Sequence, residues 1–170
     1  MTTPSRNGTF TIEGDQTVMT FRRRLPYPIQ AVWAAITDPD QREQWMGKTA
    51  IDAREGGSIE TVASDPPAAE EAKRMTGRIL VWDPPHVLEH EWKQPIVEDG
   101  VVRYELTADG DGTLLRFTHR GLGVRNASGF LGGSHAYLDR LEAYLTGEEL
   151  PDWTTRRLEV NQSAHRLEAN

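Results

Sequence analysis

The sequence predicts a single α+β domain, in which a curved antiparallel sheet packs against one long C-terminal helix. Between residues 49 and 120, hydrophobic residues mostly alternate with polar ones, which is typical of half-buried strands. Residues 128–147 instead repeat hydrophobic residues at helical spacing. A run of strands followed by a helix favours an α+β arrangement, and 170 residues suit one domain.

Composition argues against several classes of function. The net charge is −7, whereas general nucleic-acid binding needs a basic face. The chain has no cysteine, which rules out disulfides, thiol nucleophiles and cysteine-bound zinc. No stretch approaches about 20 apolar residues, so we expect no membrane span. The N-terminus lacks the apolar core of a signal peptide, so we expect a cytoplasmic protein.

The first 48 residues predict strand structure followed by two short helices. Residues 9–25 alternate around a Gly-Asp pair, which indicates either two strands or one strand with a lead-in. Residues 28–37 change to helical spacing, and Asp38 before Pro39 is a good N-cap for a second helix ending near Trp45. We interpret the run Arg22–Arg24 as a solvated strand edge.

The middle of the chain predicts mainly strands, for a total of about six to seven in the sheet. Residues 48–62 indicate two strands hinged at Gly56–Gly57, and residues 64–73 a proline-containing loop. Further strands are expected at 74–82, 86–92, 101–108 and 113–121, the last two joined by a DGDG turn.

Three segments are expected along the chain. Residues 1–16 form a lead-in strand or arm, residues 17–147 the domain, and residues 148–170 a tail. In the tail, Trp153, Val160 and Leu167 are seven residues apart, with Ala164 between them. This spacing predicts either an amphipathic helix that docks on the body or on a second subunit, as in a homodimer, or a frayed terminus.

The stretch PPHVLEHEW contains His86, Glu89 and His90 in the H-x-x-E-H spacing of some zinc peptidases. That chemistry needs a helix, but the alternation around Leu88 and Trp92 predicts a strand. On a strand the two histidines would stand about 13 Å apart, whereas zinc ligands lie about 2 Å from the metal. We therefore interpret the motif as accidental and predict no metal site.

The same alternation places one polar ring on the inward face of each of three neighbouring strands: His90, Tyr104 and His119. Buried polar groups need partners. The three rings could satisfy one another, backbone or water in an ordinary core. They could instead be the orienting polar groups of a ligand cavity. A metal held by the two histidines is the least favoured interpretation, because no carboxylate joins that face.

Several quoted segments, taken in order, resemble a known family. RRLPYPIQAVWAAITDPDQREQWMG, the Gly pair at 56–57, GRILVWDPPHVLEHEW, DGTLLRFTHRGL and GGSHAYLDRL are similar to homologues of the activator of heat-shock protein 90 ATPase. These belong to the START-like (SRPBCC, Bet v 1-like) superfamily, and the chain resembles its single-domain bacterial-type members. The resemblance implies a helix-grip fold with a hydrophobic cavity between sheet and C-terminal helix. It also implies that Val32–Trp33 pack the first helix on the sheet.

One position departs from the family pattern. Relatives commonly have Gly-Trp, often Gly-Trp-His, at the start of the last helix, whereas here Gly133 is followed by Ser134 and His135. The missing indole should either enlarge the cavity or leave space that Phe130 or Trp92 fills.

We therefore predict binding of a small hydrophobic or amphipathic ligand, such as a lipid or polyketide, without a cofactor. The resemblance also allows a stress-associated role. One alternative is a cyclase-like or hydrolase-like enzyme with His90 or His119 as general acid or base. Another is a co-chaperone-like or other protein-interaction module. The predicted ligand-binding residues are Trp45, Met46, His90, Trp92, Tyr104, Phe117, His119, Phe130 and Ser134.

Overall fold

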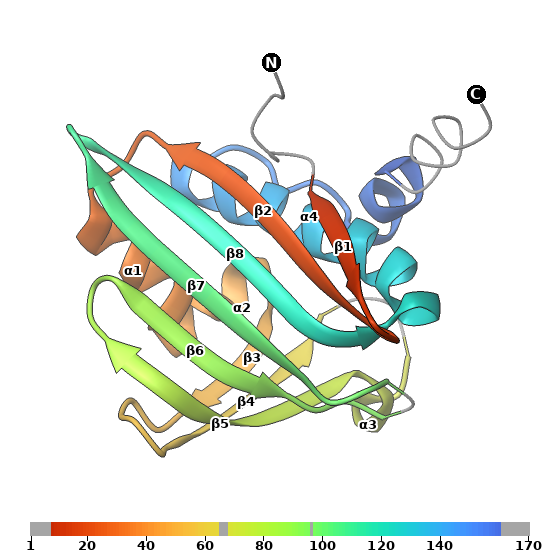
Figure 1. Cartoon of the computed structure of the whole chain (residues 1–170). Helices are drawn as coiled ribbons and strands as arrows, with labels where there is room; N and C mark the ends of the chain where they lie inside the picture. The colour runs from red at the N-terminus through yellow and green to blue at the C-terminus, as the bar shows by residue number, and fades with distance from the viewer. Residues whose placement is uncertain (1–7, 65–67, 96, 161–170) are drawn as a thin grey trace.

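A computed structural model describes residues 8–64, 68–95 and 97–160. Within them, eight strands form one antiparallel sheet in the order β1-β2-β8-β7-β6-β5-β4-β3 (Figure 1). The strands are β1 (Thr9–Glu13), β2 (Gln16–Leu25), β3 (Gly47–Ile51), β4 (Ser58–Ala63), β5 (Arg74–Asp83), β6 (Val87–Trp92), β7 (Gly100–Asp109) and β8 (Gly112–Gly123). The helices are α1 (Ile29–Thr37), α2 (Pro39–Trp45), α3 (Glu70–Lys73) and α4 (Val124–Thr146). Residues 153–160 form a further helix, here called the tail helix.

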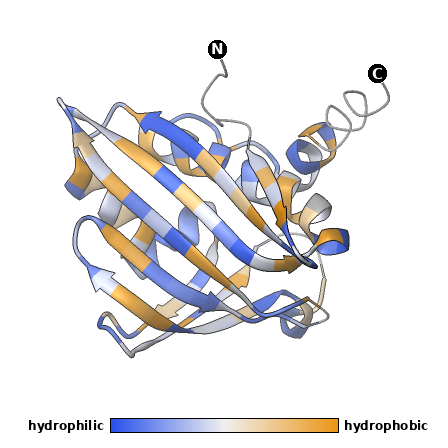
Figure 2. Ribbon diagram, in the orientation of Figure 1, coloured by the Kyte–Doolittle hydropathy of each residue, from blue (hydrophilic) through white to orange (hydrophobic). Residues whose placement is uncertain are grey.

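The predicted fold class is confirmed: the sheet is curved, and α1, α2 and α4 lie on one of its faces (Figure 1). Bulges in β8 at Gly121, opposite Thr17 and Val18 of β2, and in β5 between Ile79 and Val81 add local bend and twist. Hydrophobic and hydrophilic residues alternate along the strands (Figure 2), so one face of the sheet packs on the helices and the other faces water.

A local sequence signal explains where α2 begins, and a Val-Trp pair explains how α1 packs. The Asp38 carboxylate accepts a 2.9 Å hydrogen bond from the backbone N–H of Asp40, as an N-cap of α2 does. Val32 of α1 is fully buried, and Trp33 meets Trp82 of β5 edge to face at 5.2 Å between ring centroids. The first helix therefore packs on the sheet through the Val-Trp pair.

The elements differ from the predicted ones in three places. The sheet has eight strands instead of six to seven, because residues 9–13 and 16–25 form two paired strands. The loop predicted at 64–73 contains the short helix α3. Helix α4 begins at Val124, four residues before the predicted start, and Gly147 ends it in the left-handed conformation with φ 74°.

The interpretation of Arg22–Arg24 as a solvated edge is wrong for the middle residue. Arg22 and Arg24 are exposed, but Arg23 is 4% exposed and its Nη1 lies 2.6 Å from Asp139 Oδ1 of α4. Alternation is the physical reason: Arg23 shares the inward face of β2 with Phe21 and Leu25, both buried.

No helix in the described part of the chain is long and apolar enough to cross a membrane.

Candidate functional site

A cavity of about 320 Å³ lies between the inner face of the sheet, α4 and the tail helix. Strands β4 to β8 supply one wall, and successive turns of α4 supply the opposite wall. Its lining residues are Trp45, Met46, Thr61, Ala63, Lys73, Met75, Trp92, Gln94, Tyr104, Phe117, His119, Arg125, Asn126, Gly129, Phe130, Gly133, Ser134, Tyr137, Leu138, Trp153 and Arg157. Most of this surface is aromatic or aliphatic, so the cavity suits an apolar guest.

The structure brings eight of the nine predicted ligand-binding residues to this cavity. Trp45 and Met46 reach it from the end of α2, where Trp45 Nε1 donates a 2.8 Å hydrogen bond to the Ala35 carbonyl. That bond fixes the indole of Trp45 in the wall. The other six come from the sheet and α4: Trp92, Tyr104, Phe117, His119, Phe130 and Ser134.

His90 is the exception, and its prediction as a cavity contact needs correction. Its side chain faces inward as expected, but it is fully buried and does not line the cavity. The ring lies between Trp92 and Tyr104, with centroids 6.3 and 6.5 Å away, and Nδ1 donates a 2.8 Å hydrogen bond to the Glu91 carbonyl. His90 thus sits in the layer beneath the cavity wall.

Three rings form the aromatic part of the wall nearest α4. Trp92 and His119 lie 5.5 Å apart, and Phe130 of α4 meets His119 edge to face at 5.6 Å. Deeper in the sheet, Tyr104 and Phe117 pack edge to face at 5.1 Å. These pairs hold one another in place, so the wall is largely preformed.

Burial keeps both inward histidines neutral. It lowers the pKa of His119 to about 4. Burial, followed by the nearby charge of Arg42, lowers the pKa of His90 to about 3. The Nε2 atoms of both rings lack a hydrogen-bond partner among the described residues, and a methyl group added to Gly100 would lie 2.8 Å from Nε2 of His119. Groups with such pKa values are poorly matched to acid–base catalysis near neutral pH.

The H-x-x-E-H motif lies on a turn and a strand, as the alternation predicts. His86 is exposed before β6, and Glu89 lies on the opposite face of β6 from His90. Glu89 Oε1 is 3.5 Å from Arg103 Nη1 and 3.3 Å from Arg120 Nη1. Within residues 8–64, 68–95 and 97–160, no group of three or more His, Asp or Glu side chains could hold a metal ion.

The tail helix supplies a cavity residue that the sequence analysis missed. Trp153 Nε1 donates a 3.0 Å hydrogen bond to the Gly133 carbonyl, and its ring lies 5.5 Å from that of Tyr137. The indole therefore lines the cavity next to Ser134. The spacing of Trp153 and Val160 pointed to a docking helix, but only the fold shows that it docks at the cavity. Leu167 and Ala164 lie outside the described residues.

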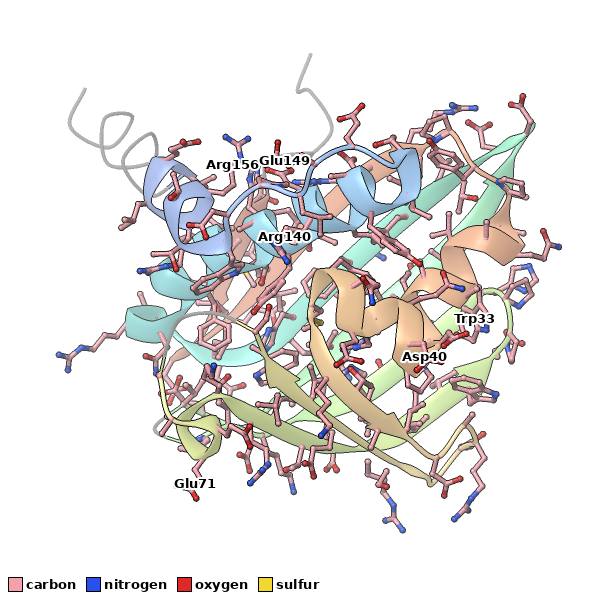
Figure 3. The ribbon with its side chains drawn as sticks, turned by 180° about the vertical axis from the view of Figure 1, so that it is seen from behind. Trp33, Asp40, Glu71, Arg140, Glu149 and Arg156 are labelled. Atoms are coloured by element: carbon pink, nitrogen blue, oxygen red, sulfur yellow. The ribbon has the colours of Figure 1, made fainter. Side chains whose placement is uncertain are left out.

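A charged cluster fastens the tail helix to the body. Asp139 of α4 accepts hydrogen bonds of 2.6 Å from both Arg23 of β2 and Arg156 of the tail helix, and His135 Nε2 lies 3.2 Å away. Arg140 also donates a 2.7 Å bond to the Pro151 carbonyl. Figure 3 shows the tail helix against α4, with Arg140 and Arg156 labelled. The tail is thus anchored to α4 at two points, Pro151 and Arg156.

Comparison with known proteins places this architecture in a family. The family model described as activator of Hsp90 ATPase homolog 1-like protein matches residues 26–146, which is most of the chain. The chain belongs to the activator of Hsp90 ATPase homolog 1-like family. The matched region runs from the start of α1 to the end of α4, and therefore includes the sheet and α4 walls of the cavity but not the tail helix.

Solved structures share the fold along nearly the whole chain. The crystal structure of CalU16 from Micromonospora echinospora is 26% identical, with a TM-score of 0.72, and the match covers 92% of this chain and 91% of CalU16. The protein encoded by gene BPP1335 from Bordetella parapertussis is also 26% identical, with a TM-score of 0.70 and coverage of 96% and 93%.

A conserved protein of unknown function from Enterococcus faecalis, EF2215, is 18% identical, with a TM-score of 0.72 and coverage of 94% and 91%, and shows the fold alone. No curated protein matches the sequence. The comparisons therefore establish the family and fold of this chain.

Proposed function

We propose that this protein binds a small hydrophobic or amphipathic molecule in the cavity between the sheet and α4. The observation that carries the proposal is the cavity itself, whose volume of about 320 Å³ lies in the range of small-molecule sites. Hydrophobic ligands are common in this family. The neutral, poorly basic His119 favours binding over acid–base chemistry, because it offers a polar contact without a reactive proton near pH 7.

The side chains of the cavity wall should lose little conformational entropy when a ligand binds. Trp45 is held by two hydrogen bonds, one from its indole to Ala35 and one that its carbonyl accepts from Arg140 Nε at 2.9 Å. Trp153 is held by Gly133. Because these large side chains are already fixed, ligand binding needs to immobilise few rotamers.

A neutral fluorescent probe tests the proposal. N-phenyl-1-naphthylamine should bind saturably to the wild-type protein with one site per chain. Ser134→Trp restores bulk at the position beside Trp153 and should weaken binding at least about tenfold, since it fills cavity volume. His86→Trp adds an indole at an exposed position outside the cavity lining, and is the control that should bind like wild type. Circular dichroism checks that both variants fold. Equal affinity in Ser134→Trp, or no saturable binding to the wild type, would overturn the proposal.

A further inference from the structure

The charged residues that line the cavity all carry the same sign. They are Lys73, Arg125 and Arg157, and no Asp or Glu belongs to the lining within the described part of the chain. The whole sequence has the opposite bias, with 26 acidic against 19 basic residues. A random sample of charged side chains from this protein would therefore be mostly acidic. The cavity is a locally positive region of an acidic protein.

The three cations come from segments that are far apart in sequence. Lys73 ends α3, Arg125 lies in the first turn of α4, and Arg157 lies on the tail helix. In Figure 1, α3 and the tail helix lie at the same end of the molecule, away from α1. All three residues retain exposure to solvent, whereas Tyr104 and Phe117 deeper in the cavity are buried. The cations therefore form the rim, and the rings form the interior.

Arg157 differs from the neighbouring arginine, Arg156, which fastens the tail. Arg156 is occupied by Asp139 and Glu159, at 2.6 and 2.9 Å. Arg157, one residue later, stacks its guanidinium 5.3 Å above the ring of Trp153, and its buried Nε has no hydrogen-bond partner among the residues described. Its side chain is thus held against the cavity wall by the indole, with donor capacity left over.

Glu98 is an acidic group that contacts Asn126, the lining residue next to Arg125. It accepts hydrogen bonds from the Gly123 N–H at 2.7 Å and from Asn126 Nδ2 at 3.0 Å. These bonds lower the pKa of Glu98, so the group is an anion at neutral pH. Its carboxylate is bound by groups at the N-terminal end of α4 and does not line the cavity.

We infer that the cavity is specific for amphiphiles with one anionic head group, such as a carboxylate on an alkyl or aryl body. This inference rests on the proposed function and adds the charge of the ligand to it. The body would occupy the space between Tyr104, Phe117 and Phe130. The head group would lie at the rim, where the planar guanidinium groups of Arg125 and Arg157 suit a carboxylate or sulfate and Lys73 adds a point charge.

The test compares ligands that share one chain and differ in head group. Decanoate, decyl sulfate, decanol and decylamine are titrated below their micelle concentrations, by displacement of N-phenyl-1-naphthylamine. We expect decanoate to bind about tenfold or more tightly than decanol, and decylamine to bind least. Decyl sulfate separates a general preference for anions from one for carboxylates. Added salt should weaken decanoate binding and leave decanol binding unchanged.

A charge-matched pair of variants controls for net charge. The rim variant Lys73→Gln/Arg125→Gln/Arg157→Gln and the control variant Arg22→Gln/Lys48→Gln/Arg54→Gln each lose three positive charges, and the control residues are all exposed and outside the cavity lining. The rim variant should bind decanoate and decanol about equally, and the control should keep the wild-type preference. The single variants Lys73→Gln and Arg125→Gln, each expected to weaken decanoate binding about two- to fivefold, replace the rim variant if it does not fold.

The outcomes separate the two claims. Equal binding of decanoate and decanol to the wild type, or an unchanged preference in the rim variant, would overturn the anionic specificity while leaving the probe-binding cavity intact. Failure of the probe and of every decyl compound to bind would remove the proposed function as well.

Discussion

Trp153 Nε1 donates a 3.0 Å hydrogen bond to the carbonyl oxygen of Gly133, and so joins the tail helix to α4 at the wall of the cavity. The glycine matters for this contact, because a methyl group at position 133 would lie 3.1 Å from Cζ2 of the indole. The Gly-Ser sequence at 133–134 thus leaves a surface on α4 that an indole from the tail covers. The cavity is completed by residues outside the region that matches the family.

Truncating Trp153 should open the cavity and loosen the tail. We expect Trp153→Ala to lower the free energy of unfolding by about 1–3 kcal/mol, less than for a fully buried tryptophan, because the side chain is half-buried. Trp153→Phe keeps most of the ring and loses only the Nε1 hydrogen bond, so it should cost about 1 kcal/mol. Urea unfolding measures both. Equal stability of Trp153→Ala and wild type would show that the indole does not pack as described.

Two glycines of α4 make a matched test of the Trp153 contact. A methyl group at Gly129 would meet nothing within 4 Å, whereas one at Gly133 would press on the indole. Gly129→Ala should therefore stabilise the protein by about 0.5–1 kcal/mol through helix propensity. Gly133→Ala should lose that gain. Thermal unfolding of the two variants decides the matter, and an equal gain from both would contradict the close contact.

Asp139 should be the most sensitive charged residue in the described chain. Burial alone would raise its pKa, but hydrogen bonds from His135 and Arg156 and the charge of Arg23 hold the pKa well below the usual value. Asp139→Asn leaves the buried Arg23 without its closest carboxylate and should cost about 3 kcal/mol. Glu159→Gln removes only the exposed partner of Arg156 and is expected to leave stability unchanged. Denaturant unfolding of both variants provides the comparison.

Stability should fall as the pH falls from about 6.5 toward 4, because of the two buried histidines. Unfolded histidine takes up a proton near pH 6.5, whereas folded His119 does so near 4 and folded His90 near 3. Between these values the unfolded state binds more protons, so each histidine contributes up to about 1.4 kcal/mol of lost stability per pH unit. Above pH 7 neither contributes. Asp139 adds a loss only below its unfolded pKa, near pH 4.

Substitutions test which residues cause this loss of stability at acid pH. His119→Asn and His90→Asn should each flatten the dependence of unfolding free energy on pH between 6.5 and 4, whatever their effect on stability at pH 7. His86→Asn replaces an exposed histidine and is the control, with an unchanged profile. If His86→Asn alone flattened the profile, the assignment to buried imidazoles would be wrong.

Alternation alone was enough to place several cavity walls. It put Trp92, Tyr104, Phe117 and His119 on the inner face of neighbouring strands, because register in a half-buried sheet follows the hydrophobic pattern. The same rule applied to β2 would have turned Arg23 inward. The charge of three consecutive arginines favours a solvated edge, but the alternation places the middle one on the inner face.

A local sequence pattern cannot predict how deeply a side chain is buried, or which distant segments come together to close the cavity. His90 and His119 share a face, but only His119 borders the cavity, because the rings of Trp92 and Tyr104 pack against His90. Trp153 and Arg157 reach the site through the docking of the tail on Gly133 and Asp139, contacts between segments that no periodicity relates. The positive rim likewise appears only when α3, α4 and the tail helix are brought together.

Methyl NMR of the methionines tests the central claim most directly. Met46 and Met75 line the cavity, whereas Met19 is buried in the core outside the lining, opposite His119 in the register of β2 and β8. Met1 lies outside the described residues. In protein with ¹³C-labelled methionine methyls, saturating unlabelled decanoate should shift the Met46 and Met75 signals and give intermolecular NOEs to both but not to Met19. Unmoved Met46 and Met75 signals at saturation, or NOEs to Met19 instead, would contradict a ligand site between the sheet and α4.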